Sequence, residues 1–268
     1  MASPVTAPPA ATPELVVAED VGSLVEAAAA RIRAEAARAI AAHGRFRIAL
    51  AGGSTPRALY PKLVTGIDWG RAQIFLGDER AVPPDDPQSN YRMARETLLA
   101  PARVPDANVH RWQSEVADLD AAARAYEQAL RAGGGPPWLD LALLGLGPDG
   151  HTASLFPGTT VLAETARLAA AVDVPAMHAR RLTLTYPAFT DGTATVFFLA
   201  TGVEKSAALA DVLRAASALP AARIIHRSGP VAIFCDRKAT QDDRGGVDGL
   251  RPSQPIAGGA GPSQGPEV

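Results

Sequence analysis

Short apolar runs alternate along this chain with segments of helical periodicity, and this alternation constrains the fold more than any other feature. The runs are almost continuously apolar, which is typical of strands buried on both faces. Strands that alternate with helices favour a parallel sheet covered by helices on both sides. We therefore expect an α/β fold with three layers and a mainly parallel sheet. The expected strands lie at residues 15–17, 47–51, 72–76, 139–146, 181–185, 195–200 and 231–235, and the expected helices at 23–43, 56–63, 91–99, 119–131 and 204–215.

The two ends of the chain differ in composition from this middle part. Residues 1–13 contain four prolines and four alanines, and eleven of the 29 residues from 240 to 268 are Gly or Pro. Segments of this composition bury too little apolar surface to offset the entropy lost on ordering. We expect flexible ends at 1–13 and 240–268 and one folded body at 14–239.

Charge and cysteine content argue against several classes of protein. Lys and Arg total 26 against 28 Asp and Glu, so the chain has no broad basic field for a nucleic-acid backbone. The single cysteine, Cys235, offers neither an internal disulfide nor a cysteine-based zinc site, and its apolar neighbours indicate a buried side chain. The apolar runs are too short to span a membrane, and the amino terminus has no signal-peptide pattern. We expect a cytoplasmic protein that binds neither nucleic acid nor membranes.

A glycine-rich turn, AGGSTP at residues 51–56, joins the second expected strand to a helix. Paired glycines, Gly52 and Gly53, let the backbone approach an anion, and Ser54 and Thr55 add hydroxyl and amide donors at the start of the helix. This pattern favours a phosphate-binding loop. Alternatively, the glycines serve only the geometry of a tight turn.

Three charged residues, Asp78, Glu79 and Arg80, follow the next strand directly. A guanidinium is suited to a two-pronged bond with phosphate or carboxylate, and the two acidic residues could hold Arg80 in place. Ser89 and Asn90 stand before the following helix. The alternative is a solvated loop in which Ser89 only caps that helix.

The loop LGLGPDGHTASLFPG at residues 144–158 carries the most informative pattern. A histidine is neutral near pH 7, so His151 could take a proton from water, while Asp149 could orient its ring and stabilise the imidazolium. The loop also matches G-x-G-x-x-G, but the Pro-Gly pair at 157–158 interrupts the helix that a dinucleotide site requires. Alternatively, His151 is merely hydrogen-bonded within its loop.

Two further cations follow expected strands or begin them. Arg181 stands at the start of a strand, and Lys205 falls in the first turn of a helix. A cation at a helix start opposes the helix dipole, a cost that an anion between them would remove. The alternative for Lys205 is a solvated surface position.

Taken in order, these segments resemble the 6-phosphogluconolactonase family, and they cover most of residues 14–239. The family's fold is a Rossmann-like α/β domain related to glucosamine-6-phosphate deaminase and ribose-5-phosphate isomerase. The matching residues are Gly52–Pro56, Gly77–Arg80 with Ser89 and Asn90, Gly145, Gly147, Asp149–Thr152, Ser154–Pro157, Arg181, Thr183, Gly202 and Lys205.

The resemblance implies hydrolysis of 6-phospho-D-glucono-1,5-lactone to 6-phosphogluconate, a step of the oxidative pentose phosphate pathway. It implies His151 as the general base and a small phosphorylated sugar lactone as the partner. No two histidines have metal-ligand spacing, so we expect no metal and no cofactor. Arg80, Lys205 and the Gly52–Thr55 loop would serve the phosphate end. The expected catalytic residues are His151, Asp149 and Arg80, and the expected substrate-binding residues are Gly52, Gly53, Ser54, Thr55, Asp78, Asn90, Arg181 and Lys205.

Two other functions remain open on this fold. One is an aminosugar-phosphate deaminase or isomerase, which would differ in the sugar phosphate that it converts. The other is a non-catalytic regulator that senses sugar phosphates, although neither end of the chain offers a DNA-binding module. We expect a monomer or a weak homodimer.

Overall fold

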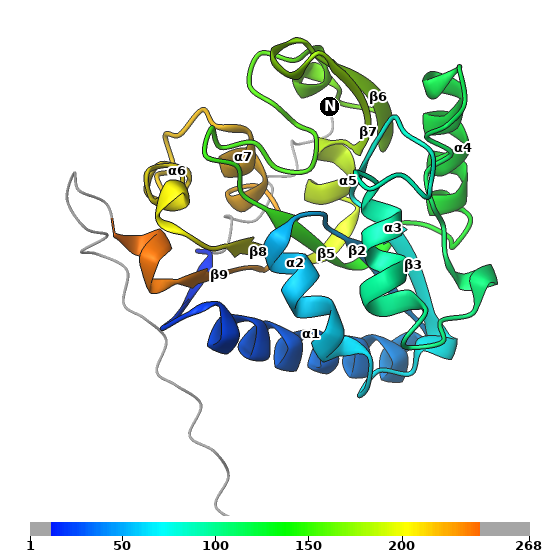
Figure 1. The fold of residues 1–268 in the computed structure, drawn as a ribbon, viewed down its shortest axis with the longest axis horizontal. Coiled ribbons are helices and arrows are strands. Elements are labelled where there is room, and N and C mark those ends of the chain that lie inside the picture. Colours follow the sequence, from blue (N-terminus) through cyan, green and yellow to red (C-terminus); the bar gives the residue numbers. More distant parts are fainter. Residues whose placement is uncertain (1–11, 242–268) are drawn as a thin grey trace, which may run out of the picture.

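The computed structural model describes residues 12–241, and its centre is a six-stranded sheet in the order β1-β9-β8-β5-β2-β3 (Figure 1). Every neighbouring pair in it is parallel, which confirms the expected α/β class. Most residues of the two expected flexible ends, 1–13 and 240–268, lie outside the described residues. The strands are β1 (Glu14–Ala18), β2 (Phe46–Leu50), β3 (Ala72–Leu76), β5 (Leu139–Gly145), β8 (Thr193–Ala200) and β9 (Val231–Asp236).

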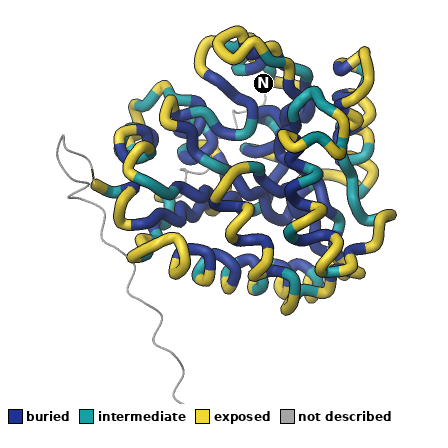
Figure 2. The backbone as a smooth tube through the Cα atoms, in the orientation of Figure 1, coloured by how far each residue is buried: buried dark blue, intermediate teal, exposed yellow. Residues whose placement is uncertain are grey.

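Helices cover both faces of this sheet and enclose a separate apolar cluster on each side. Alternate residues of β2 show the division, since Ile48 and Leu50 belong to one cluster and Ala49 to the other. Figure 2 shows the inner strands of the sheet buried between the two layers, while the edge strand β1 is only partly buried. The first layer holds α1 (Val21–His43), α2 (Ser54–Leu59) and α3 (Asn90–Ala94), which continues as a π-helical turn at Arg95–Leu99. The second holds α4 (Leu119–Arg131), α5 (Tyr186–Thr190), α6 (Ser206–Val212) and α7 (Pro220–Ile225).

The longest helix, α1, shows how local sequence sets the element boundaries. Asp20 caps its start, because the carboxylate accepts a hydrogen bond from the Ser23 amide at 2.8 Å. Gly44 ends it with a φ of 80°, a left-handed conformation that favours glycine. Between these caps, small and apolar residues of one face, including Leu24, Ala28 and Ile32, are fully buried against the sheet.

A second, antiparallel sheet of three strands lies beside the main one, in the order β4-β7-β6. The strand expected at 181–185 belongs here, so its assignment to the parallel sheet was wrong. Helix α4 packs on β6 and β7 and covers this small sheet. Its strands are β4 (Asp78–Arg80), β6 (Ala169–Val174) and β7 (Ala179–Leu184).

The register of the main sheet brings several strand ends to one edge. Strands β2 and β3 run level, from Phe46 opposite Ala72 to Leu50 opposite Leu76. The Gly77 amide then donates to the Leu50 carbonyl at 2.8 Å and holds the two exits together. Ligands of such sheets bind at the carboxyl ends of the strands, so the loops after β2, β3 and β5 are the place to look for a site.

Candidate active site

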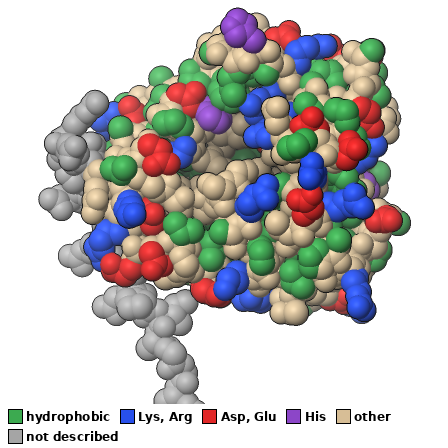
Figure 3. All heavy atoms as spheres, viewed as in Figure 1, with side chains coloured by type: hydrophobic (Ala, Val, Ile, Leu, Met, Phe, Trp, Pro, Cys, Tyr) green, Lys and Arg blue, Asp and Glu red, His purple; other side chains and the backbone are tan. Residues whose placement is uncertain are grey.

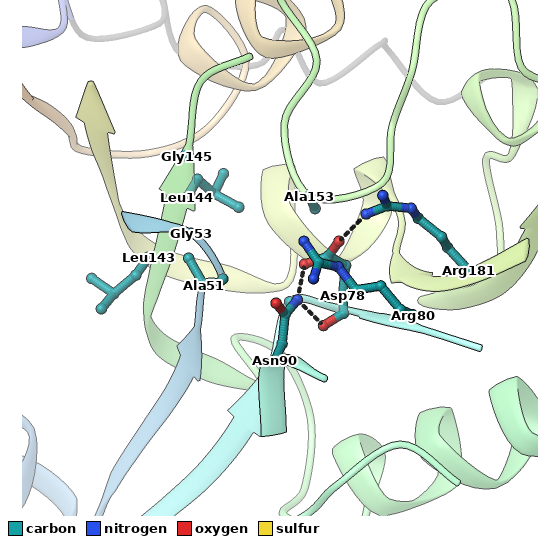
Figure 4. A pocket seen from close by; sticks show the side chains of 12 residues that line it. Ala51, Gly53, Asp78, Arg80, Asn90, Leu143, Leu144, Gly145, Ala153 and Arg181 are labelled. Carbon is teal, nitrogen blue, oxygen red and sulfur yellow. Dashed lines mark hydrogen bonds and ion pairs between the residues drawn. The ribbon is translucent and has the colours of Figure 1, made fainter. Parts of the chain in front are cut away.

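A hollow of about 100 Å³ opens at the carboxyl ends of β2, β3 and β5. It lies in the face shown in Figure 3, which is hollowed near its centre with Lys and Arg side chains along the border. Figure 4 shows that its polar side chains come from the small sheet and α3, while β5 supplies an apolar wall. The lining residues are Ala51, Gly52, Gly53, Gly77, Asp78, Arg80, Asn90, Leu143, Leu144, Gly145, Ala153 and Arg181.

The glycine turn after β2 contributes its two glycines to the hollow. A Cβ on Gly52 would lie 2.0 Å from the Asn90 side-chain oxygen, so only glycine permits this contact. Gly53 has a φ of 109°, which a side chain would strain. Ser54 and Thr55 do not line the hollow, and the Thr55 hydroxyl is bonded to that of Thr201 at 2.7 Å. Helix α2 begins at Ser54 and has only six residues, so the glycine backbone is the part of the turn that faces a ligand.

Two arginines face one another across the small sheet. Arg80 of β4 is the register partner of Arg181 of β7, and opposite residues of an antiparallel pair project from the same face. Arg181 is only 8% exposed, and the Nε atoms of both side chains are buried without a hydrogen-bond partner in the described part of the chain. Burial lowers the pKa of Arg181, and the charge of Arg80 lowers it further against the opposing effect of Asp78. Two like charges placed opposite each other are unfavourable, so this pair is poised for an anion.

Asp78 connects the hollow's polar side chains. Its Oδ1 accepts a hydrogen bond from Asn90 Nδ2 at 3.0 Å, and its Oδ2 accepts one from Ser154 Oγ at 2.7 Å. Arg181 Nη1 lies 3.8 Å from Oδ2, and Figure 4 marks this ion pair. Asp78 thus orients Arg181 and Asn90.

The expectation that Asp78 and Glu79 hold Arg80 in place is wrong. Within residues 12–241 neither carboxylate forms an ion pair with Arg80, whose Nη1 donates instead to the Gln88 carbonyl. The Glu79 side chain turns away from the hollow and accepts hydrogen bonds from Ser89 Oγ and from the amides of Arg80, Asn90 and Tyr91. Glu79 therefore fastens β4 to the start of α3. The side chain of Ser89 does cap α3, by accepting from the Arg92 amide, as its alternative reading predicted.

The loop after β5 holds the His151 ring on three sides. Nδ1 is 2.5 Å from Asp149 Oδ1, and the ring stacks on Phe156 with centroids 4.1 Å apart. A Cβ on Gly147 would lie 2.0 Å from Nδ1, so the ring packs directly on this glycine. Burial acts to raise the pKa of Asp149, but the hydrogen bond and charge of His151 outweigh it and leave this pKa below its ordinary value. The Asp149 carboxylate is therefore ionised and fixes the ring, while Nε2 has no hydrogen-bond partner within residues 12–241.

Phe156 joins the histidine to the two-arginine hollow. One face of its ring carries His151, and the Arg181 guanidinium lies 5.4 Å from its centroid. Ala153 of the same loop lines the hollow. His151 and Asp149 are thus placed at the border of the hollow although they are not among its lining residues.

Lys205 lies in the turn between β8 and α6, outside the hollow's lining. No hydrogen bond or ion pair of its ammonium occurs within the described residues. Sequence reasoning gave no role to Phe156 or Ser154, although both lie in the glycine-rich loop. The sequence signal for Ser154 was a polar residue inside a motif with other functional residues. In the structure it is fully buried.

Metal-binding clusters and membrane-spanning helices are both absent from the described residues. Between residues 12 and 241, no group of three or more His, Cys, Asp or Glu side chains is arranged to hold a metal ion. The same residues contain no helix of the length and apolarity needed to cross a membrane.

The family model described as Glucosamine-6-phosphate isomerases/6-phosphogluconolactonase matches residues 19–233. The chain belongs to this family. The 6-phosphogluconolactonase of Synechocystis is 38% identical to it over 230 residues, which are 82% of this chain and 94% of that protein. The 6-phosphogluconolactonase of Mycobacterium tuberculosis is also 38% identical over 230 residues, covering 81% of this chain and 92% of its own.

Solved structures of the 6-phosphogluconolactonase family have the same fold. The crystal structure of the enzyme from Thermotoga maritima matches with a TM-score of 0.74 and 31% identity, covering 83% of this chain and 98% of that one. The resemblance noted in the sequence is therefore confirmed, as is the fold that it implied.

Proposed function

We propose that this chain hydrolyses 6-phospho-D-glucono-1,5-lactone to 6-phosphogluconate, with His151 as the general base. The observation that carries the proposal is the His151–Asp149 pair at the border of a hollow that contains two opposed arginines. The arginine pair suits a phosphoryl group, and the histidine pair suits activation of water. The curated relatives of Synechocystis and M. tuberculosis, both named for this reaction, support it over the aminosugar alternative.

The reaction needs only a positioned water, a base and a proton donor, because a δ-lactone is already an activated ester. Nε2 of His151 takes a proton from water as the oxygen adds to the lactone carbonyl carbon. The tetrahedral intermediate then collapses, the bond from this carbon to the ring oxygen breaks, and Nε2 returns the proton to the departing alkoxide. Asp149 stabilises the transient imidazolium and keeps a proton on Nδ1.

Arg80 and Arg181 bind the phosphoryl group in this proposal. Their guanidinium groups supply donors, and a dianion between them removes the repulsion of the facing guanidiniums. Gly52 and Gly53 leave the backbone of the adjacent turn open to the ligand. Asn90 and Asp78 position the arginine side of the hollow, and Lys205, Ser54 and Thr55 stay predictions for the phosphate end.

The wider organisation stays a prediction as well. We propose residues 14–239 as a single catalytic body, since β1 and β9 pair and join its two ends. The cytoplasmic location and the state of monomer or weak homodimer rest on the sequence alone.

The purified protein tests the proposal with three substrates: the phosphorylated lactone, unphosphorylated gluconolactone and glucosamine 6-phosphate. We expect hydrolysis of the first at a rate far above its spontaneous rate. Arg80→Gln and Arg181→Gln should each raise KM for the phosphorylated lactone about 10- to 100-fold, the usual cost of losing a hydrogen bond to a charged group. Both should affect gluconolactone much less.

Arg124→Gln is a matched control, because it removes an exposed arginine of α4. Equal losses on both lactones in the hollow variants would contradict the phosphate assignment. Deamination of glucosamine 6-phosphate without lactone hydrolysis would replace the proposed reaction by the aminosugar alternative.

A further inference from the structure

A second cleft lies at the opposite edge of the main sheet, where β2 and β3 begin. Its volume is about 440 Å³, within the range of small-molecule sites, which is roughly 300–1,000 Å³. None of its residues takes part in the proposed reaction. Among its lining residues are Arg45, Arg47, Arg71, Gln73, His110 and Gly133.

Arg47 is the unusual residue of this cleft, because it is only 5% exposed and has no carboxylate partner in residues 12–241. Its Nη2 donates to the Leu130 carbonyl, and its guanidinium lies 5.4 Å from the centroid of the Phe75 ring. The Arg47 guanidinium packs against Gly133, where a Cβ would lie 2.4 Å from Nη1. Burial and the nearby charge of Arg45 lower the pKa of Arg47, with Asp140 acting against them. A buried cation without a counter-ion is costly, so this arrangement calls for a negative charge.

The acidic groups around the cleft are already engaged. Asp140 bonds His43 through Oδ1 at 2.9 Å and the Arg47 amide through Oδ2 at 2.8 Å. Asp68 pairs with Arg71 at 3.4 Å. Arg45 donates only to the Gly133 carbonyl within the described chain. The cleft therefore carries a surplus of positive charge.

We propose that this cleft is a second binding site, for a small molecule that carries a phosphoryl group. Arg45, Arg47 and Arg71 would bind the phosphoryl oxygens, since guanidiniums present fixed, forked donors to such groups. The remaining volume suits a small polar body beside His110, whose Nε2 lies 2.8 Å from Gln73 Oε1. Burial and Arg47 lower the pKa of His110, so this ring acts as a neutral hydrogen-bonding group. The site goes beyond the proposed function and does not depend on it.

Site-resolved NMR of the ¹⁵N-labelled full chain tests the site, because both anion sites can then be followed in one titration. Inorganic phosphate and a hexose monophosphate are the two probes. We expect saturable shifts of the Gly44, Gly70 and Gly133 amides, with a Kd separate from that of Gly52 and Gly53. Tighter binding of the sugar phosphate would show that the sugar contacts the cleft, and equal binding would show recognition of the phosphoryl group alone; both support the site.

The double variant Arg45→Gln/Arg71→Gln should weaken cleft binding at least about tenfold while kcat and KM in phosphate-free buffer stay parental. Both arginines are exposed, so the fold should tolerate the change. The matched control is Arg95→Gln/Arg124→Gln, which removes two exposed arginines outside the cleft. Absence of saturable shifts at the three cleft glycines would overturn the proposal. So would an equal loss of binding in the control, because the loss would then come from removing two positive charges anywhere on the surface rather than from the cleft.

Discussion

The His151 imidazole is fixed by Asp149, Gly147 and Phe156, which leaves Nε2 as the atom available to water. We predict that His151→Ala lowers kcat about 10²- to 10⁴-fold, the usual contribution of a general base. KM should stay within a few-fold of the parental value, because the arginine contacts remain. Steady-state kinetics with the spontaneous hydrolysis subtracted measures both constants. A folded variant with more than about a tenth of the parental kcat would remove His151 from the mechanism.

Asp149→Asn is the companion variant. It should reduce kcat less than His151→Ala does, because the carboxylate orients the ring and stabilises its charge without receiving the proton. A thermal melt of both variants separates loss of chemistry from loss of fold.

Phe156 contacts both the base and a phosphate-binding arginine through one aromatic ring. We predict that Phe156→Leu lowers kcat about 2- to 10-fold, in proportion to the worth of an aromatic stack. Phe156→Tyr keeps the ring and should keep the parental kcat. Steady-state kinetics of the two variants measures the difference. A parental kcat in Phe156→Leu would reduce Phe156 to a packing residue.

At the scale of elements, Glu79 connects the three-residue strand β4 to helix α3. Glu79→Gln replaces one carboxylate oxygen, which accepts hydrogen bonds, by an NH2 group, which points at the donors around it. We predict a loss of about 1–3 kcal/mol in the free energy of unfolding, the cost of leaving buried polar groups unpaired. Ser89→Ala removes one of the hydrogen bonds and should cost less. Urea titrations of the two variants measure the difference, and a Glu79→Gln protein as stable as the parent would contradict the assigned role.

The stability difference between the parent and Glu79→Gln should also depend on pH. Burial raises the pKa of Glu79 above its ordinary value of 4.5, against the lowering effect of its hydrogen bonds. The folded state therefore holds this proton more tightly than the unfolded state, and the contribution of Glu79 to stability is lost as pH rises through its folded pKa. Glu79→Gln lacks this term, so the stability gap between parent and variant should be larger near pH 5 than near pH 8. A gap that widens toward high pH would contradict the raised pKa.

The sequence predicted the main sheet well because its strands are mostly apolar runs, interrupted by few polar residues such as Arg47 in β2 or Asp140 in β5. The strand at 181–185 was predicted, but its partners β4 and β6 were missed for two physical reasons. Strand β6 starts with three alanines, which have low strand propensity, and β4 is three charged residues whose extended form depends on pairing with β7. The three strand-end motifs were also found from sequence, but not the choice of Arg181 as the partner of Asp78. That choice depends on the register of β4 and β7, about 100 residues apart, which local pattern does not encode.

At the scale of the whole molecule, the two apolar clusters share one sheet and should unfold together. Trp69 belongs to one cluster and Trp112 to the other. We predict that fluorine NMR of protein labelled with 5-fluorotryptophan gives the same urea midpoint for both residues, because the shared strands couple the layers. Loss of the Trp69 signal at a clearly lower urea concentration than that of Trp112 would show two independent folding units.

The pairing of β1 with β9 also has a consequence for how the chain is made. Within residues 12–241 the sheet partner of β1 is β9, which leaves the ribosome about 210 residues later, a delay of roughly 10–40 s at ordinary synthesis rates. The apolar strand β8 is made about 30 residues before β9, so for roughly 2–6 s of synthesis it stands at an open sheet edge, which is a template for aggregation. A nascent chain that stalls before Val231 would therefore leave β1 unpaired and one side of β8 open, since β8 pairs only with β5 at that stage. Addition of β9 completes the main sheet, and codon changes that slow its translation should lower the soluble yield without altering the finished protein.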